Sequence, residues 1–464
     1  MTTQLSAADQ VAQGRAARAR VRRRDHAIFE PAPDRPNPID LLEQQAETRV
    51  PELVPIRYGR MLVSPFAFFR GAALVMAQDL ATTPASGLNV QACGDAHMSN
   101  FGVFASPERH LIFDVNDFDE TLPGPWEWDV KRLAASLAIA GRDRGFSPAE
   151  RRTAVTAAAE MYRSAMRGFA SMGTMDVWYA HLDVDDVMAR FGSQLTASGR
   201  KRTQEELTKA RTRDSLQAFN KLTAVVDGRR RIISDPPLIV PVEELLSEGD
   251  ATEFMANIRG LLRAYRRTLS SERRVLLDRF QLVQMARKVV GVGSVGTRAW
   301  ILLMEGRDNG EPLFLQAKEA QSSVLEGLVG KSEFGNCGQR VVVGQRLMQA
   351  VSDVFLGWDR VLGLDAQVRD FYVRQLRDWK GSADVTIMQP AGMAAYARLC
   401  GWTLARGHAR SGNRQAIAAY LGAGPAFDDA IAVFAETYAD QNERDYEQLR
   451  QAVADGKITA QTGL

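Results

Sequence analysis

The 464-residue sequence predicts an α+β protein in which a small antiparallel β-sheet lobe is inserted into a larger helical body. β-Branched and aromatic residues interrupted by glycine-rich turns concentrate between residues 281 and 380, a pattern typical of strands. The flanking segments, 41–280 and 381–464, are rich in residues that favour helices. Hydrophobic residues make up 45% of the chain and charged residues 25%, so the chain can bury a sizeable core and is not a disordered or fibrous protein.

Charge and cysteine content exclude several classes of protein. The chain has 58 Lys and Arg residues against 56 Asp and Glu, a net charge of +2, so no global excess predicts nucleic-acid binding. The apolar stretches are shorter than the ~20 residues that span a bilayer. Three cysteines are too few for a disulfide scaffold and suit a reducing compartment. We therefore expect a cytoplasmic protein without a membrane segment.

An Arg-rich leader over residues 1–40 precedes the helical body. Its basic run extends from Arg15 to Arg24, and the apolar stretch of a signal peptide does not follow it. Such a charge run is typical of a solvated helix or a flexible leader. The alternative is an arm that contacts an acidic protein partner. Residues 27–58 are rich in proline and predict an extended strap.

Capping and patterning place the remaining elements in order. Ser64-Pro65 predicts the start of a helix. Residues 110–115 predict a strand, 116–125 a loop and 126–145 an amphipathic helix. After residue 285 we expect two strands around a glycine-rich turn, a third strand over 312–320, a helix near 336–352, and a strand followed by a hinge over 368–382. From residue 393 the chain is helical again.

Polar residues in two of these loops form a first candidate site. Asp95 and Asn100 lie five residues apart in GDAHMSN, and Asp117 follows in NDFDE, just after a predicted strand. This set suits phosphoryl transfer, because one carboxylate can orient a hydroxyl nucleophile while the amide oxygen and the other carboxylate hold Mg²⁺. The alternative is that Asp95 and Asn100 are only turn and cap residues.

Glycines and a lysine form a second candidate site. GVGSVG places Gly291, Gly293 and Gly296 in a G-x-G-x-x-G pattern around Ser294, and Lys318 follows on a predicted strand. A dinucleotide-binding fold requires a helix after the glycines, whereas TRAWILLMEG predicts a strand. A kinase-type loop requires strand, glycines, strand and a lysine on a third strand. Its N–H groups would cover ATP phosphates that the lysine neutralises. A glycine-rich hairpin without a ligand is the alternative.

These motifs resemble known families. GDAHMSN resembles the catalytic loop of aminoglycoside phosphotransferases and choline kinases, although Cys93 stands where those enzymes usually have histidine. NDFDE resembles their metal-binding segment, and GPWEWDVKRLAAS resembles the helix with a structural aspartate, here Asp129. GVGSVG with LQAKEA resembles the nucleotide-binding lobe of protein kinases. The longer string from SPFAFFRGAA to LQAKEA resembles a bacterial family catalogued as domain of unknown function 2252, over about residues 40–450.

The kinase resemblance implies a bilobed, protein-kinase-like fold in circularly permuted order, because Lys318 follows Asp95 instead of preceding it. VRQLRDWKGS resembles the hinge, and GWTLARGHARSG resembles the helix that leads to the catalytic loop. Taken from residue 285 to 412 and then from 60 to 140, the elements fall in kinase order. Permutation is tolerated where chain ends lie close together at the surface. The expected units are the leader 1–40, the helical lobe 41–280, the nucleotide-binding lobe 281–380 and the helical return 381–464.

The resemblance implies an enzyme that uses ATP and Mg²⁺ to phosphorylate a hydroxyl of a small molecule. Asp95 would accept the hydroxyl proton, and Asn100 and Asp117 would hold the metal. Asp114 and Asp119 are alternatives for the metal-binding carboxylate. Two other functions stay open: transfer of a nucleotidyl (AMP) group, and a non-catalytic nucleotide-binding module that contacts a partner through the leader.

Two further assignments stay open at this point. Kinases pair the lysine of the third strand with a glutamate, and here Glu319, Glu326 and Glu333 are all candidates. Arg70, in SPFAFFRGAA, either binds phosphate or pairs with a local carboxylate.

Overall fold

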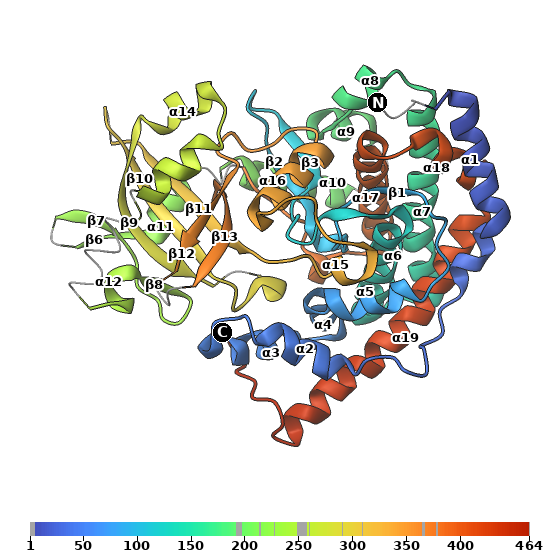
Figure 1. Ribbon diagram of the computed structural model, residues 1–464, viewed down its shortest axis with the longest axis horizontal. Helices are drawn as coiled ribbons and strands as arrows, with labels where there is room; N and C mark the ends of the chain where they lie inside the picture. The colour runs from blue at the N-terminus through green and yellow to red at the C-terminus, as the bar shows by residue number, and fades with distance from the viewer. Residues whose placement is uncertain are drawn as a thin grey trace.

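The computed structural model describes residues 5–191, 197–212, 215–226, 228–247, 258, 260–289, 291–308, 310–363, 367–376 and 379–463. A sheet-rich part and a helical body lie next to each other (Figure 1). The predicted α+β class is confirmed. The predicted hinge includes residues 377 and 378, which lie outside the described residues.

Long helices make up the centre of the helical body. They are α6 (Trp126–Asp143), α7 (Pro148–Ser171), α17 (Pro390–Ser411) and α19 (Ala426–Ala454), with the short α18 (Arg414–Leu421) between the last two. Helix α7 packs along α17, and α19 packs on both α6 and α7. Trp126 of α6 and Tyr162 of α7 stack on each other, with ring centroids 5.4 Å apart. The main hydrophobic core therefore joins helices from the two ends of the chain.

The N-terminal segment is folded onto this body. It contains α1 (Ala7–Arg20), α2 (Pro38–Ala46), α3 (Val54–Met61), α4 (Pro65–Gly71), α5 (Ala73–Ala81) and the 3-10 helices η1 (Arg23–Ala27) and η2 (Pro51–Leu53). Helix α1 contacts α18 so closely that a Cβ at Gly14 would lie 2.0 Å from the carbonyl oxygen of Ala416. The arginine run therefore belongs to a packed helix and not to a flexible leader, and α2 and α3 replace much of the predicted extended strap.

A six-stranded antiparallel sheet forms the core of the other part, in the order β12-β13-β11-β10-β9-β8. The strands are β8 (Ile239–Pro241), β9 (Phe280–Lys288), β10 (Ala299–Gly306), β11 (Pro312–Ala320), β12 (Gly357–Leu362) and β13 (Val368–Gln375). The 3-10 helix η5 (Val292–Ser294) lies between β9 and β10, and the helices α15 (Glu326–Val329) and α16 (Cys337–Met348) lie between β11 and β12.

The register of this sheet decides which side chains share a face. Lys318 of β11 is paired with Tyr372 of β13, and Gln316 is paired with Arg374. Because side chains alternate along a strand, these four side chains project from the same face. The opposite face packs in a separate apolar cluster that includes Trp300, Leu315 and Phe371. One face of the sheet is thus polar where it meets the helical body.

Smaller sheets carry the loops at that junction. β1 (Asn89–Ala92) pairs with β4 (Leu122–Pro125), and β2 (Phe101–Ala105), β3 (Leu111–Val115) and β5 (Leu182–Asp183) form a second sheet. The 3-10 helix η3 (Met98–Asn100) precedes β2, and η6 (Val385–Ile387) precedes α17. The stretch between α7 and β9 contains α8 (Thr174–Tyr179), α9 (Val184–Phe191), α10 (Ala197–Arg211), α11 (Ser215–Leu222), α12 (Val242–Leu245), α14 (Ser271–Leu277) and a hairpin of β6 (Thr223–Val226) and β7 (Arg229–Ile232).

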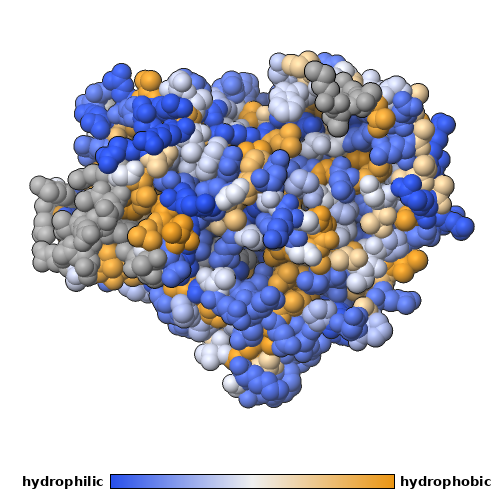
Figure 2. Space-filling view, in the orientation of Figure 1, coloured by the Kyte–Doolittle hydropathy of each residue, from blue (hydrophilic) through white to orange (hydrophobic). Residues whose placement is uncertain are grey.

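Hydrophilic side chains cover most of the face seen in Figure 2, and apolar ones appear there in small separate groups. Among the described residues, a single helix long and apolar enough to cross a membrane does not occur. The pair α18 and α19, bent by 85°, meets the length and composition criteria only when the two helices are taken together.

Candidate functional site

The candidate site lies where three loops meet: the GDAHMSN loop (residues 94–100), the NDFDE loop (116–120) and the glycine-rich loop (291–296). Asp129, in the first turn of α6, anchors the first of them. Its two carboxylate oxygens accept hydrogen bonds from the backbone N–H groups of Cys93 (2.7 Å) and Gly94 (3.0 Å). His408 of α17 lies 3.1 Å from the same carboxylate. A buried charge therefore fixes the backbone that leads into Asp95.

Asp95 is held by a second residue of α6. The guanidinium of Arg132 donates to Asp95 Oδ1 at 2.8 Å, and His97 Nε2 lies 3.7 Å from Oδ2. Burial, together with the positive charges of Arg70 and Arg132, holds the pKa of His97 well below its usual value, so His97 is neutral. Oδ1 is therefore committed to the scaffold, and the neutral imidazole of His97 adds no positive charge beside Oδ2.

Asn100 closes the GDAHMSN loop. Its side-chain Nδ2 donates to the backbone carbonyl oxygen of Asp95 at 2.8 Å, and its backbone carbonyl oxygen accepts from the backbone N–H of Asn116 at 2.8 Å. The side-chain oxygen is the atom of this amide that is left for a cation. The loop thus connects Asp95 directly to the NDFDE loop.

Gly94 is needed where these two loops touch. Its φ is +81°, a conformation that L side chains rarely adopt. A Cβ at this position would lie 2.3 Å from the carbonyl oxygen of Glu120. Both the backbone conformation and the close approach therefore require glycine.

Asp119 is the carboxylate on which the sheet and the NDFDE loop converge. It accepts hydrogen bonds from Lys318 Nζ at 2.6 Å and Tyr372 Oη at 2.7 Å, and a longer one from Ser294 Oγ at 3.4 Å. Lys318 and Ser294 belong to the second sequence motif, 199 and 175 residues further along the chain than Asp119. The two predicted sites therefore form one site.

Asp117 lies beside this cluster, with its carboxylate 3.9 Å from Lys318 Nζ. Burial and the neighbouring charge of Asp119 raise the pKa of Asp117. Burial acts in the same direction on Asp119, but the charge and hydrogen bond of Lys318 outweigh it and lower the pKa of Asp119. For Lys318, burial is outweighed by the two aspartates, which raise its pKa. Lys318 is therefore charged, and the two carboxylates share its charge unequally.

The chemistry of this donor set fits a divalent cation. Asp117 and Asp119 repel each other, and a hard cation prefers carboxylate and amide oxygens such as those of the two aspartates and Asn100. A bound cation would relieve the repulsion that raises the pKa of Asp117. Among the described residues, no group of three or more His, Cys, Asp or Glu side chains is arranged to hold a metal ion on its own. Such a cation would need ligands from substrate or water, as Mg²⁺ usually does.

The structure distinguishes among the alternatives left open for two residues. Asp114 is buried in an ion pair with Arg406 of α17, which commits it to the scaffold. Glu319, next to Lys318, pairs with Arg298 and Arg369 at 3.3 and 3.4 Å.

The other two glutamates do not supply the partner of Lys318 either. Glu326 accepts from the N–H of Ser323 and lies 4.0 Å from Arg340, and Glu333 is exposed. Helix α16, which follows the lysine strand, has no glutamate in its sequence. Its Arg340 is buried and donates instead to the carbonyl oxygens of Asp119 (2.8 Å) and Thr121 (2.7 Å). The helix therefore acts on the NDFDE loop directly, and Asp119 is the ion-pair partner of Lys318.

The glycine-rich loop is seated on the N-terminal helices. The carbonyl oxygen of Gly296 accepts from the N–H of Val50 at 2.8 Å. A Cβ at Gly293 would lie 3.3 Å from the carbonyl oxygen of Arg70, whereas one at Gly291 would meet open space. The loop therefore covers α4 and places Ser294 over Asp119.

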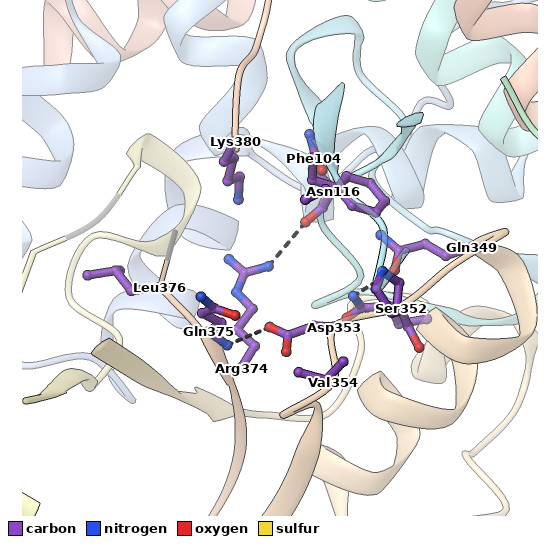
Figure 3. Close-up of a pocket in the computed structure, with 13 residues that line it drawn as sticks. Phe104, Asn116, Gln349, Ser352, Asp353, Val354, Arg374, Gln375, Leu376 and Lys380 are labelled. Carbon is purple, nitrogen blue, oxygen red and sulfur yellow. Dashed lines mark hydrogen bonds between the residues drawn. The ribbon is translucent and has the colours of Figure 1, made fainter. Parts of the chain in front are cut away.

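A cavity of about 80 Å³ opens beside Asn116, the first residue of the NDFDE loop (Figure 3). Arg374 projects into it and donates to the carbonyl oxygen of Asn116 at 3.3 Å, while Lys380 points toward Arg374 from the opposite side. The charge of Arg374 and burial lower the pKa of Lys380 to about 7. Two cationic side chains that face each other across this cavity favour an anion there.

A larger cavity, about 430 Å³, lies on the opposite face of the sheet from Lys318. Its walls are mainly apolar side chains such as Trp300, Leu302 and Phe371. The candidate site is thus identified by convergent charged groups and not by cavity size.

Sequence reasoning named most of the residues that meet here. Asp95, Asn100, Asp117, Ser294 and Lys318 lie together, and Asp119 was among the alternatives. It missed others that depend on tertiary contacts. Tyr372 and Arg374 reach the site through the strand register, Arg132 through the packing of α6, and Lys380 follows the last strand. A sequence signal for these residues is lacking, because each is an ordinary strand, helix or loop residue in its local pattern.

Comparison with known proteins gives one match. The sequence model of a family described as "Uncharacterized protein conserved in bacteria (DUF2252)" matches residues 49–452. No curated protein matches the chain, and no solved structure does.

Proposed function

Since the chain belongs to this family of uncharacterized bacterial proteins, we propose a function from its own site: an ATP- and Mg²⁺-dependent phosphotransferase with a circularly permuted, protein-kinase-like fold. The observation that carries the proposal is the contact of Asp119 with Lys318 and Ser294. A glycine-rich loop, a strand lysine and an aspartate loop in mutual contact are the parts that phosphoryl transfer from ATP uses.

The order of elements supports the permutation. Helix α17 ends at Ser411, and the hydroxyl of Ser411 accepts a hydrogen bond from the N–H of Gln91 in β1 at 3.1 Å. A Cβ at Gly412 would lie 2.5 Å from the Val90 side chain. The end of α17 therefore lies against the strand that leads into the GDAHMSN loop, where an unpermuted chain would continue.

Each residue has a role in the proposed reaction. Asp95 orients the acceptor hydroxyl and takes its proton, while Arg132 and Asp129 position the loop that carries it. Lys318 neutralises nucleotide phosphates under the glycine-rich loop. Asn100 with Asp117 and Asp119 would hold Mg²⁺, which neutralises phosphate charge when bound. The acceptor is a hydroxylated small molecule.

Calorimetric titration of ATP with and without Mg²⁺ tests the nucleotide site. We expect metal-dependent binding, weakened roughly 10- to 100-fold by Lys318→Ala, because a charge-assisted hydrogen bond contributes about 1.5–3 kcal/mol. Asp117→Ala and Asp119→Ala should weaken it only when Mg²⁺ is present. Lys331→Ala is the matched control, because Lys331 is exposed. Absence of binding by the wild-type protein would refute the proposal.

Turnover tests the role of Asp95 separately. Asp95→Asn should abolish phosphate transfer or slow ATP hydrolysis by at least ~100-fold, since general-base catalysis contributes about 10²–10⁴-fold. It should leave ATP affinity within about twofold, because Asp95 faces the acceptor. Retained turnover in this variant would rule out the assignment. Release of pyrophosphate instead of ADP, with AMP attached to the acceptor, would indicate nucleotidyl transfer on the same site.

A further inference from the structure

Arg70, at the end of α4, is a half-buried cation beside the site. No described residue accepts a hydrogen bond from its Nε, although that atom is buried. Burial lowers the pKa of Arg70, and the opposing charges that act on it are those of Asp95 and Asp117. The Nε of this half-buried guanidinium is thus without the paired geometry that normally offsets burial of a charge.

The neighbouring Arg132 shows what a scaffold arginine looks like here. Its Nε donates to Asp95 at 2.8 Å, and its Nη2 donates to the carbonyl oxygen of Phe69 at 2.8 Å. It also lies over the Phe69 ring, 3.8 Å from the centroid. Asp95 already has this arginine as its partner, so the charge of Arg70 is not needed to neutralise it.

The backbone around Arg70 is fixed on both sides. Phe69 O accepts from Arg132, and Gly71 O accepts from Arg57 Nη2 at 3.0 Å. The carbonyl oxygen of Arg70 itself lies under Gly293 of the glycine-rich loop. The carbonyl groups on either side of Arg70 are therefore hydrogen-bonded and its own lies against the glycine-rich loop, which fixes the backbone from which the side chain extends.

We infer that Arg70 is a catalytic residue that binds the phosphoryl group in transit. The inference rests on the proposed phosphotransferase function. In that reaction the acceptor oxygen forms a bond to the terminal phosphorus, the bond from that phosphorus to the bridging oxygen of ADP breaks, and the hydroxyl proton passes to Asp95. The transferred group would lie between Asp95 and Asp117, and Arg70 directly follows Phe69, whose carbonyl oxygen is linked to Asp95 through Arg132. An arginine in this position stabilises the charge on the equatorial oxygens.

A planar mimic of the transferred group tests this role without an acceptor. Binding of ADP with Mg²⁺ is measured by calorimetry in the presence and absence of tetrafluoroaluminate. For the wild-type protein we expect the mimic to tighten binding by at least ~100-fold, as transition-state analogues do. Arg70→Ala should bind ADP with Mg²⁺ within about twofold of wild type and lose most of that tightening. Arg152→Ala is the control, because Arg152 pairs with Asp429 at the surface.

Arg70→Lys separates charge from geometry. Lysine keeps the charge but lacks the planar fork that contacts two oxygens at once, so we expect only part of the tightening, about tenfold less than wild type. This variant also decides the matter if Arg70→Ala does not fold, which thermal melting would reveal.

Three outcomes count against the inference, and they are distinguishable. Full tightening in Arg70→Ala, or in Arg70→Lys if the alanine variant is unfolded, overturns the role of Arg70 alone. ADP binding without tightening in the wild-type protein shows that no planar phosphoryl group is recognised, and this also overturns it. Failure of the wild-type protein to bind ADP removes the proposed function and the inference with it.

Discussion

Asparagine in place of Asp129 keeps the shape of the side chain but removes its charge and one of its two acceptors. Asp129 accepts from the N–H groups of Cys93 and Gly94 and contacts His408. The amide must present its NH₂ group to one of these donors. One charge-assisted hydrogen bond is lost, about 1.5–3 kcal/mol, and one buried donor is left unpaired, about 1–3 kcal/mol. Because the two costs overlap, we expect the free energy of unfolding to fall by about 2–5 kcal/mol.

Urea unfolding of Asp129→Asn, followed by circular dichroism, measures this loss as a shift of the midpoint at constant m-value. Asp429→Asn is the control, because Asp429 forms an ion pair with Arg152 in which more than half of its side chain is exposed, 56%. Exposed pairs contribute about 0–1 kcal/mol. A loss in Asp129→Asn no larger than that of the control would refute the idea that Asp129 anchors the GDAHMSN loop.

Two further predictions concern the same site. Lys380→Met tests the lowered pKa of Lys380, about 7. Because Lys380 loses the charge that favours an anion as the pH rises, the ATP affinity of the wild-type protein should fall by up to about tenfold from pH 6 to pH 8. Calorimetry at both pH values should show a smaller fall in the variant. The same pH dependence of ATP affinity in Lys380→Met as in the wild-type protein would contradict this prediction. Gly94→Ala should lower the free energy of unfolding by about 1–3 kcal/mol more than Gly145→Ala, because both glycines have positive φ but a Cβ at Gly145 meets open space; equal urea midpoints would count against the contact at Gly94.

Local patterns in the sequence located many elements of the fold. Ser64 accepts from the N–H of Ala67 at the start of α4, as the Ser-Pro signal predicts. Lys318 lies on a strand after a glycine-rich turn, and large apolar residues such as Trp300, Ile301 and Phe314 make up much of that strand and of the one before it. These signals work because caps and strand propensity act over a few residues.

Other features depend on contacts that no local pattern encodes. Asp117 and Asp119 are two residues apart, and spacing alone cannot tell which carboxylate accepts from Lys318. Residues 27–58 contain helices despite their prolines, since Pro38 occupies the first turn of α2, where proline is tolerated. The pairing of Asp114 with Arg406 spans 292 positions of the sequence.

The distance along the chain between Asp129 and His408, 279 residues, also affects how the protein is made. A ribosome that adds about 5–20 residues per second needs roughly 15–55 s between these two residues. During that time α6 and α7 have been synthesised, but α17 and α19, which cover them, have not. The nascent chain therefore exposes a long apolar helical surface before its last helices emerge, so we expect its yield in cells to depend on chaperones that bind such surfaces.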